Sequence, residues 1–225
     1  MMFRIKICGI KNVADAEAAV AAGADAIGLN FYAPSPRSID RATAREVVSA
    51  IGARVCKVGL FVNASLDEVR AAHDDLGLDL IQLHGDERAD FLRGLAPRPV
   101  MKALRLGPDG LASVKSWLDD AMRSSLFPKL LLLDAYRPGQ YGGTGATADW
   151  SQAAAYARTP KVPPLVLAGG LTAENVAAAI RTVRPTAIDT AGGVESSPGV
   201  KNAAMMQAFV AAARAAFAEL VVGEE

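Results

Sequence analysis

Residues 165–189 read LVLAGGLTAENVAAAIRTVRPTAID, and this stretch decides the fold. It opens with a short aliphatic run that ends at Gly169-Gly170, continues through an Ala-rich amphipathic segment, and closes with a second short run that ends at Asp189. A strand, a helix and a second strand in this order pair the strands in parallel, with the helix as the crossover connection. The stretch therefore predicts one βαβ unit of an α/β protein.

The same alternation fills the rest of the chain. We predict strands at 3–8, 26–31, 55–62, 80–84, 100–104, 130–134, 165–168 and 187–189, and helices at 12–22, 42–51, 66–76, 88–95, 111–122, 149–157, 173–183 and 202–220. Eight units of about 28 residues each are typical of a (β/α)8 TIM barrel. The main alternative, a doubly wound sheet, would carry G-x-G-x-x-G after its first strand, where this sequence has Cys8-Gly9-Ile10. We predict a single (β/α)8-barrel domain over residues 1–225.

Local signals support several helix boundaries. Ser65 and Glu68 form a predicted capping box, and Thr172 is the predicted N-cap of the seventh helix. Glycines that suit a left-handed cap follow three predicted helices, at Gly23, Gly52 and Gly77.

Composition excludes several classes of function. The 24 basic and 24 acidic residues balance, which argues against nucleic-acid binding. We find no run of about 20 unbroken apolar residues, no signal-peptide pattern, and only two cysteines. We therefore expect a cytoplasmic protein that binds neither membranes nor nucleic acid. The two histidines form no H-x-x-H spacing and the cysteines no C-x-x-C, so we expect no catalytic metal.

Most of the uncommon residues fall at the carboxyl ends of the predicted strands, where barrel enzymes place their chemistry. They are Cys8, Asn30, Asn63, His84, Asp134, Gly169, Gly170 and Asp189. This asymmetry predicts an active site at that end of the barrel.

Two glycine pairs predict a phosphate site. Gly169-Gly170 follows the seventh strand and Gly192-Gly193 the eighth, where many barrels hold a phosphate on backbone N–H groups. Either pair alone could be an ordinary turn, but both at this position favour phosphate binding. Residues 194–196 are a candidate for the short extra helix that completes such a site.

Cys8 and Asp134 are the candidate base and acid. The first strand alternates Phe3, Ile5 and Ile7 with Arg4, Lys6 and Cys8. Cys8 is therefore expected in the barrel interior, where Lys6 and the phosphate rim would lower its pKa from about 8.5 towards neutrality. Asp134 ends an aliphatic strand, where a carboxylate is costly unless it is paired or used. The alternatives are a buried structural thiol, as we expect for Cys56, and a loop cap.

Two further residues are candidates for substrate binding. Arg37 lies in a loop stiffened by Pro34 and Pro36, which suits a bidentate grip on a carboxylate, although a solvated surface arginine is the ordinary alternative. His84 either binds substrate or caps the loop after the fourth strand. An acid and a base on opposite sides of one molecule fit a proton shift between neighbouring carbons.

Several of these segments together resemble the phosphoribosylanthranilate isomerase family. They are KICGI at 6–10, Phe31 through SPR at 35–37, QLHGDE at 82–87, LDA at 133–135, GGTG at 142–145, LAGGL at 167–171, and GVE at 193–195 through PGVK at 198–201. The resemblance implies a (β/α)8 barrel of tryptophan biosynthesis that performs an Amadori rearrangement on a small phosphosugar without a cofactor.

The resemblance also implies residue roles. Asp134 would open the furanose ring as general acid, Cys8 would take the proton from the second sugar carbon, and Arg37 would hold the anthranilate carboxylate. Backbone groups around Gly170 and Gly193 would hold the phosphate, and residues 142–145 would form a mobile cover. The sequence departs from the family at 191–192, where Ala-Gly replaces two serines, and at 202, where Asn replaces an acid.

Other readings remain open. A different phosphosugar isomerase would be expected to have Asp rather than Cys at the end of the first strand, and a pentose-phosphate epimerase would need a metal cluster. A non-catalytic phosphosugar-binding barrel would tolerate the loss of Cys8 or Asp134. The sequence does not decide between a monomer and a homodimer.

Overall fold

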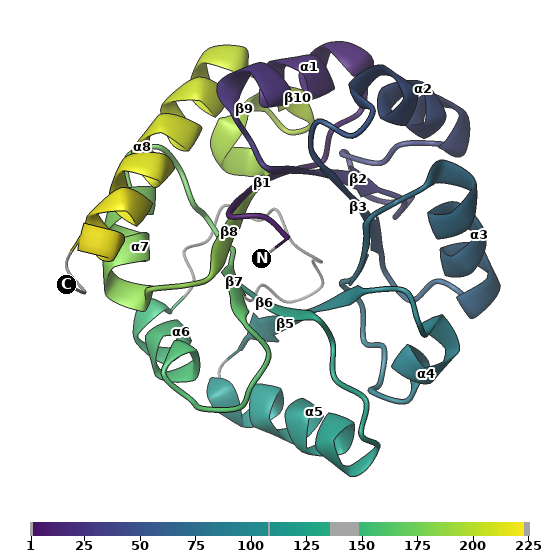
Figure 1. Cartoon of the computed structure of the whole chain (residues 1–225), viewed down its shortest axis with the longest axis vertical. Coiled ribbons are helices and arrows are strands. Elements are labelled where there is room, and N and C mark those ends of the chain that lie inside the picture. Colours follow the sequence, from purple (N-terminus) through teal and green to yellow (C-terminus); the bar gives the residue numbers. More distant parts are fainter. Residues whose placement is uncertain (1, 108, 136–148, 223–225) are drawn as a thin grey trace.

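The computed structural model describes residues 2–107, 109–135 and 149–222 of the chain. Within them, eight parallel strands close into a barrel in which each strand pairs with its neighbours in chain order and β8 pairs with β1. The helices form a ring around the strands (Figure 1). The predicted (β/α)8 barrel is therefore confirmed.

The strands and helices alternate as the periodicity predicts. The strands are β1 Ile5–Cys8, β2 Ala26–Asn30, β3 Cys56–Phe61, β4 Leu80–Leu83, β5 Val100–Leu106, β6 Leu130–Ala135, β7 Leu165–Leu167 and β8 Ala187–Thr190. The helices are α1 Val13–Ala22, α2 Arg41–Ile51, α3 Leu66–Leu76, α4 Phe91–Leu95, α5 Leu111–Arg123, α6 Trp150–Ala157, α7 Val176–Val183 and α8 Ala203–Val222. After β8 come a 3-10 turn, η1 Gly192–Val194, and a hairpin of β9 Glu195–Ser197 with β10 Val200–Lys201.

Two hydrophobic cores hold the barrel together. The larger one lies between the strands and the outer helices and includes Ile5 and Ile7. The smaller one fills the barrel interior and includes Val58, Leu132 and Val166. Because side chains alternate along a strand, every strand but β1 contributes to both cores, and the inward positions of β1 are Lys6 and Cys8.

The expected placement of Phe3 is wrong. We expected Phe3 to share a face with Ile5, but it belongs to the inner core. The reason is that the alternation begins only with the strand at Ile5. Just before it, the N–H groups of Arg4 and Ile5 both donate to Asp25 Oδ2, at 3.1 and 2.9 Å, which bends the chain. Arg4 points outward and stacks on the ring of Phe217.

The helix caps agree with the sequence signals in part. Ser65 and Glu68 form the predicted capping box of α3. Gly23 and Gly77 end their helices in the left-handed conformation, while Gly52 ends α2 with a different backbone geometry. The predicted cap at Thr172 is wrong, because α7 begins later, at Val176, with Asn175 at its N-cap position.

The C-terminal helix α8 is long and apolar. Over Ala203–Leu220 its mean hydropathy is 1.2, so length and composition alone would suit a membrane span, contrary to our expectation from the sequence. In the structure Phe209 and Val210 are buried in the outer core, and α8 packs beside α1 and α7. Its composition therefore suits a core helix. Asn202, which replaces the usual acid, caps it by accepting from Met205 N–H at 3.0 Å.

Candidate active site

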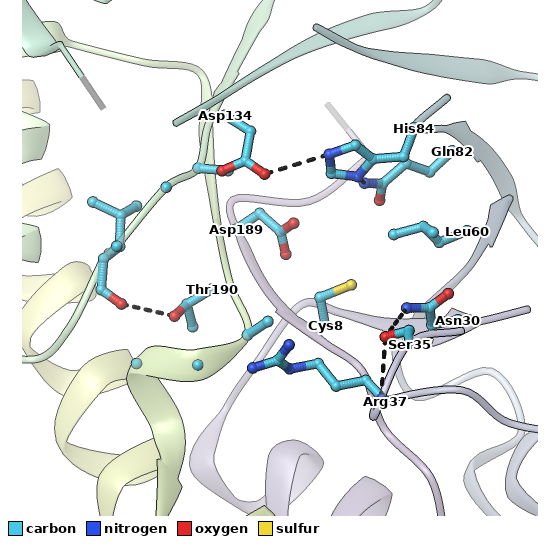
Figure 2. A pocket seen from close by; sticks show the side chains of 17 residues that line it. Cys8, Asn30, Ser35, Arg37, Leu60, Gln82, His84, Asp134, Asp189 and Thr190 are labelled. Atoms are coloured by element: carbon cyan, nitrogen blue, oxygen red, sulfur yellow. Dashed lines mark hydrogen bonds and ion pairs between the residues drawn. The ribbon is translucent and has the colours of Figure 1, made fainter. Parts of the chain in front are cut away.

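One cavity at the carboxyl ends of the strands contains every predicted site residue (Figure 2). These residues are Cys8, Arg37, His84, Asp134, Gly169, Gly170, Gly192 and Gly193. They come from six different strand ends or the loops that follow them, and the closure of the barrel brings them together. Asn30 and Asp189, which the sequence marked only as uncommon strand-end residues, line the same cavity.

Cys8 ends β1 and points into the cavity, as predicted (Figure 2). The expectation of a lowered pKa is wrong. Burial raises the pKa of the Cys8 thiol above its ordinary value, and the opposing charge of Lys6 does not offset this. The sequence placed Lys6 correctly but could not show how completely the thiol is removed from water. Cys56, the first residue of β3, is half-buried, and burial raises its pKa to about 11.

A buried ion pair lies beneath Cys8. Lys6 Nζ donates to Asp189 Oδ1 at 2.9 Å, and the two residues are register partners on β1 and β8. Burial alone would lower the pKa of Lys6, but the charges of Asp189 and Cys8 outweigh it and leave the pKa raised. Lys6 is therefore a charged group next to the thiol. The sequence signal for this pair is a charged residue at an interior position of each of two adjoining strands.

Asp134 ends the aliphatic part of β6 and faces His84, which follows β4 (Figure 2). His84 Nε2 lies 3.3 Å from Asp134 Oδ2, and His84 Nδ1 lies 3.0 Å from the amide nitrogen of Gln82. An amide nitrogen can only donate, so this contact runs from Gln82 to His84 Nδ1. His84 is therefore a neighbour of Asp134 inside the cavity rather than a loop cap.

The two glycine pairs both line the cavity. Gly193 has no room for a side chain, because a Cβ there would lie 1.8 Å from the carbonyl oxygen of Leu171. The Thr190 hydroxyl donates to that same oxygen at 2.8 Å, so the loops after β7 and β8 are in direct contact. The predicted extra helix at 194–196 is wrong. The helical turn is η1, which begins at Gly192 itself, and Glu195 already belongs to a strand.

Arg37 is buried and lines the cavity, which excludes the solvated surface alternative. Its side chain forms a bidentate contact with Glu195, with Nε–Oε1 at 2.8 Å and Nη2–Oε2 at 2.7 Å. Burial alone would raise the pKa of Glu195, but Arg37 and Lys201 hold it below its ordinary value. In the sequence, Glu195 and Lys201 belong to a motif but nothing near them predicts a role for either. The predicted cover at 142–145 lies outside the described residues.

Comparisons with known proteins agree with this geometry. The family model of N-(5'-phosphoribosyl)anthranilate (PRA) isomerase matches residues 5–212. An N-(5'-phosphoribosyl)anthranilate isomerase of Pseudomonas aeruginosa is 51% identical over 214 residues, covering 94% of this chain and 95% of its own. One from Pseudomonas paraeruginosa is 53% identical over 213 residues, with the same two coverages of 94% and 95%.

Solved structures give the same result. Phosphoribosyl anthranilate isomerase of Thermotoga maritima has a TM-score of 0.81 at 36% identity, covering 95% of this chain and all of its own. A phosphoribosyl anthranilate isomerase in complex with reduced 1-(o-carboxyphenylamino)-1-deoxyribulose 5-phosphate has a TM-score of 0.78 at 35% identity, with the same coverage. The chain belongs to the N-(5'-phosphoribosyl)anthranilate isomerase family.

Proposed function

We propose that Asp134 and Cys8 are the general acid and the general base of the reaction that this family performs. The chain is an aldose–ketose isomerase of tryptophan biosynthesis. It converts N-(5'-phosphoribosyl)anthranilate to 1-(2-carboxyphenylamino)-1-deoxyribulose 5-phosphate by an Amadori rearrangement. The observation that supports the proposal is that Cys8 and Asp134 lie at the carboxyl ends of different strands, β1 and β6, and line one cavity.

In the first step Asp134 gives a proton to the ring oxygen of the ribose. The bond from the anomeric carbon to that oxygen breaks, and the nitrogen lone pair forms a Schiff base with the same carbon. Asp134 is left as a carboxylate. His84 Nε2 lies 3.3 Å from Oδ2 of that carboxylate.

In the second step the Cys8 thiolate takes the proton from the second carbon of the sugar. The electron pair moves into the iminium group and gives an enolamine, which tautomerises to the ketone. Because burial raises the pKa of Cys8, the thiol is the main form in the free enzyme at neutral pH. The ammonium of Lys6 is the nearby charge that stabilises this form.

Substrate binding fixes the sugar between acid and base. Backbone N–H groups around Gly170 and Gly193 hold the phosphate, and Arg37 holds the anthranilate carboxylate. Anchoring both ends of the molecule supplies several kcal/mol of the barrier reduction by positioning alone, since effective molarities of intramolecular reactions correspond to about 7–11 kcal/mol. Ala191 and Gly192 offer no hydroxyl to the phosphate, so we expect phosphate affinity to differ from that of relatives with serines there.

The test is a fluorescence assay that follows the loss of phosphoribosylanthranilate generated in place. We expect turnover by the purified chain with a chelator present, since no cofactor or metal is assigned a role. Cys8→Ala and Asp134→Ala should each lower kcat by orders of magnitude while circular dichroism shows an intact fold. An unchanged kcat in either variant would refute the role of that residue.

We further propose that the chain works as one catalytic domain in the cytoplasm, as a monomer or a homodimer. The Thermotoga maritima isomerase is described as dimeric in a structure of its engineered monomers, which has 34% identity to this chain. Sedimentation equilibrium at several concentrations decides between the two states here. A larger assembly would contradict the proposal.

A further inference from the structure

Among the residues that the structure describes, Glu195 is the side chain that binds the guanidinium of Arg37. Glu195 accepts from Nε and from Nη2, the two nitrogens along the side edge of the group. A guanidinium has five N–H groups in one plane, so a second fork, formed by Nη1 and the remaining N–H of Nη2, lies on another edge. A carboxylate bound to the first fork therefore fixes the plane in which the second fork points.

Glu195 is itself fixed on three sides. Lys201 Nζ donates to Glu195 Oε1 at 2.8 Å, and Gly199 N–H donates to Oε2 at 3.1 Å. Lys201 Nζ also donates to the carbonyl of Ala191 at 2.9 Å. The Glu195 side chain is only 3% exposed, so these contacts lie away from water, where charge-assisted hydrogen bonds are strongest.

These contacts connect the two ends of the substrate site. Glu195 starts β9 directly after η1, the turn that carries Gly192 and Gly193. Arg37 lies against the same turn, because a Cβ at Gly192 would be 3.4 Å from Arg37 Nη2. Figure 2 shows the Arg37 side chain extending across the cavity on the other side of Cys8 from Asp134. The position of Arg37 relative to the glycine loops is therefore set through Glu195 and the β9–β10 hairpin.

We propose that Glu195 is a positioning residue that determines selectivity for a substrate with a carboxylate on its aromatic amine. It does so by presenting the second fork of Arg37 to that carboxylate, while its own side chain does not line the cavity. This inference rests on the proposed role of Arg37. The selectivity then depends on a residue 158 positions after Arg37 in the chain.

The experiment compares two substrates on the same proteins. One is N-(5'-phosphoribosyl)anthranilate and the other is N-(5'-phosphoribosyl)aniline, which lacks the carboxylate, each formed in place from ribose 5-phosphate and the amine. The readout is the ratio of kcat/KM for the two. In Glu195→Gln we expect this ratio to fall about tenfold to a hundredfold, the range for losing one charge-assisted hydrogen bond, mainly through KM for the anthranilate substrate. Inhibition by inorganic phosphate should not change.

A second variant covers the case in which Glu195→Gln does not fold, and a double variant tests its coupling to Arg37. Glu195→Asp keeps the buried charge but is one methylene shorter, so it should lower the same ratio even if Glu195→Gln does not fold. In an Arg37→Ala background, Glu195→Gln should have no further effect on the ratio, because the two residues act as one unit. Glu87→Gln is the matched control, since Glu87 is a buried carboxylate paired with a lysine outside this cavity, and it should leave the ratio unchanged.

The outcomes distinguish a failure of the proposed function from a failure of the positioning role of Glu195. If the unaltered protein turns over neither substrate, the proposed function fails. If it turns over the anthranilate substrate, and a folded Glu195→Gln or Glu195→Asp keeps the original ratio, the positioning role is overturned. Equal loss of activity on both substrates also overturns it, because that result marks Glu195 as a support of the fold alone.

Discussion

Gly28 on β2 gives the sharpest test of how tightly the base is placed. Gly28 is the register partner of Cys8, and a Cβ built on it would lie 2.6 Å from Cys8 Sγ and 3.0 Å from Lys6 Nζ. Non-bonded heavy atoms rest at about 3.5–4.0 Å, so Gly28→Ala must displace the thiol by roughly 1 Å. A misplacement of about 1 Å can lower a rate about a hundredfold, and overpacking costs about 1–3 kcal/mol of stability.

The assay measures kcat/KM by fluorescence and the free energy of unfolding by urea denaturation. Gly59→Ala is the matched control, because a Cβ there would lie 2.5 Å from Leu78 Cδ1, on the outer side of the barrel wall. Both variants should lose stability, but only Gly28→Ala should lose about two orders of magnitude in kcat/KM. Equal activity in the two variants would refute the reasoning that the space left by Gly28 holds the thiol in place.

Two other predictions follow from buried charges. Because burial raises the pKa of Cys8, the rate at which iodoacetamide alkylates Cys8 in a Cys56→Ser background should increase about tenfold per pH unit through the neutral range. An alkylation rate that is flat through neutral and mildly alkaline pH would contradict a raised pKa of this thiol. Lys102 Nζ donates to Glu87 Oε2 at 2.6 Å, away from water, so Glu87→Ala leaves an unpaired buried ammonium. Urea denaturation should show a loss of about 3–5 kcal/mol, and an unchanged midpoint would disprove the importance of the pair.

The barrel could be predicted because its determinants are local. Hydrophobic periodicity sets each strand and helix, and strict alternation of the two leaves a parallel sheet as the outcome. The position of the site followed from the same rule. Once β1 and β6 are parallel strands of one barrel, Cys8 and Asp134 must end at the same rim.

The missed features depend on contacts between distant parts of the chain. Arg37 and Glu195 are 158 positions apart, and nothing near either residue indicates that they meet. The pKa of Cys8 was misjudged because the nearby charge of Lys6 is visible in the sequence, whereas the loss of water around the thiol is a property of the closed barrel. Phe3 was misplaced because the bend before β1 comes from a hydrogen bond to Asp25.

The pairing of β1 with β8 has a consequence for biosynthesis. Of the barrel strands, the ribosome makes β1 first and β8 last, so the thiol emerges long before the carboxylate that balances Lys6. Until residue 189 has been added, the first strand keeps one unpaired edge, which is open to unwanted association with other chains. A nascent chain therefore carries its base without the base's surroundings, and catalytic competence is expected only after the last strand joins the first.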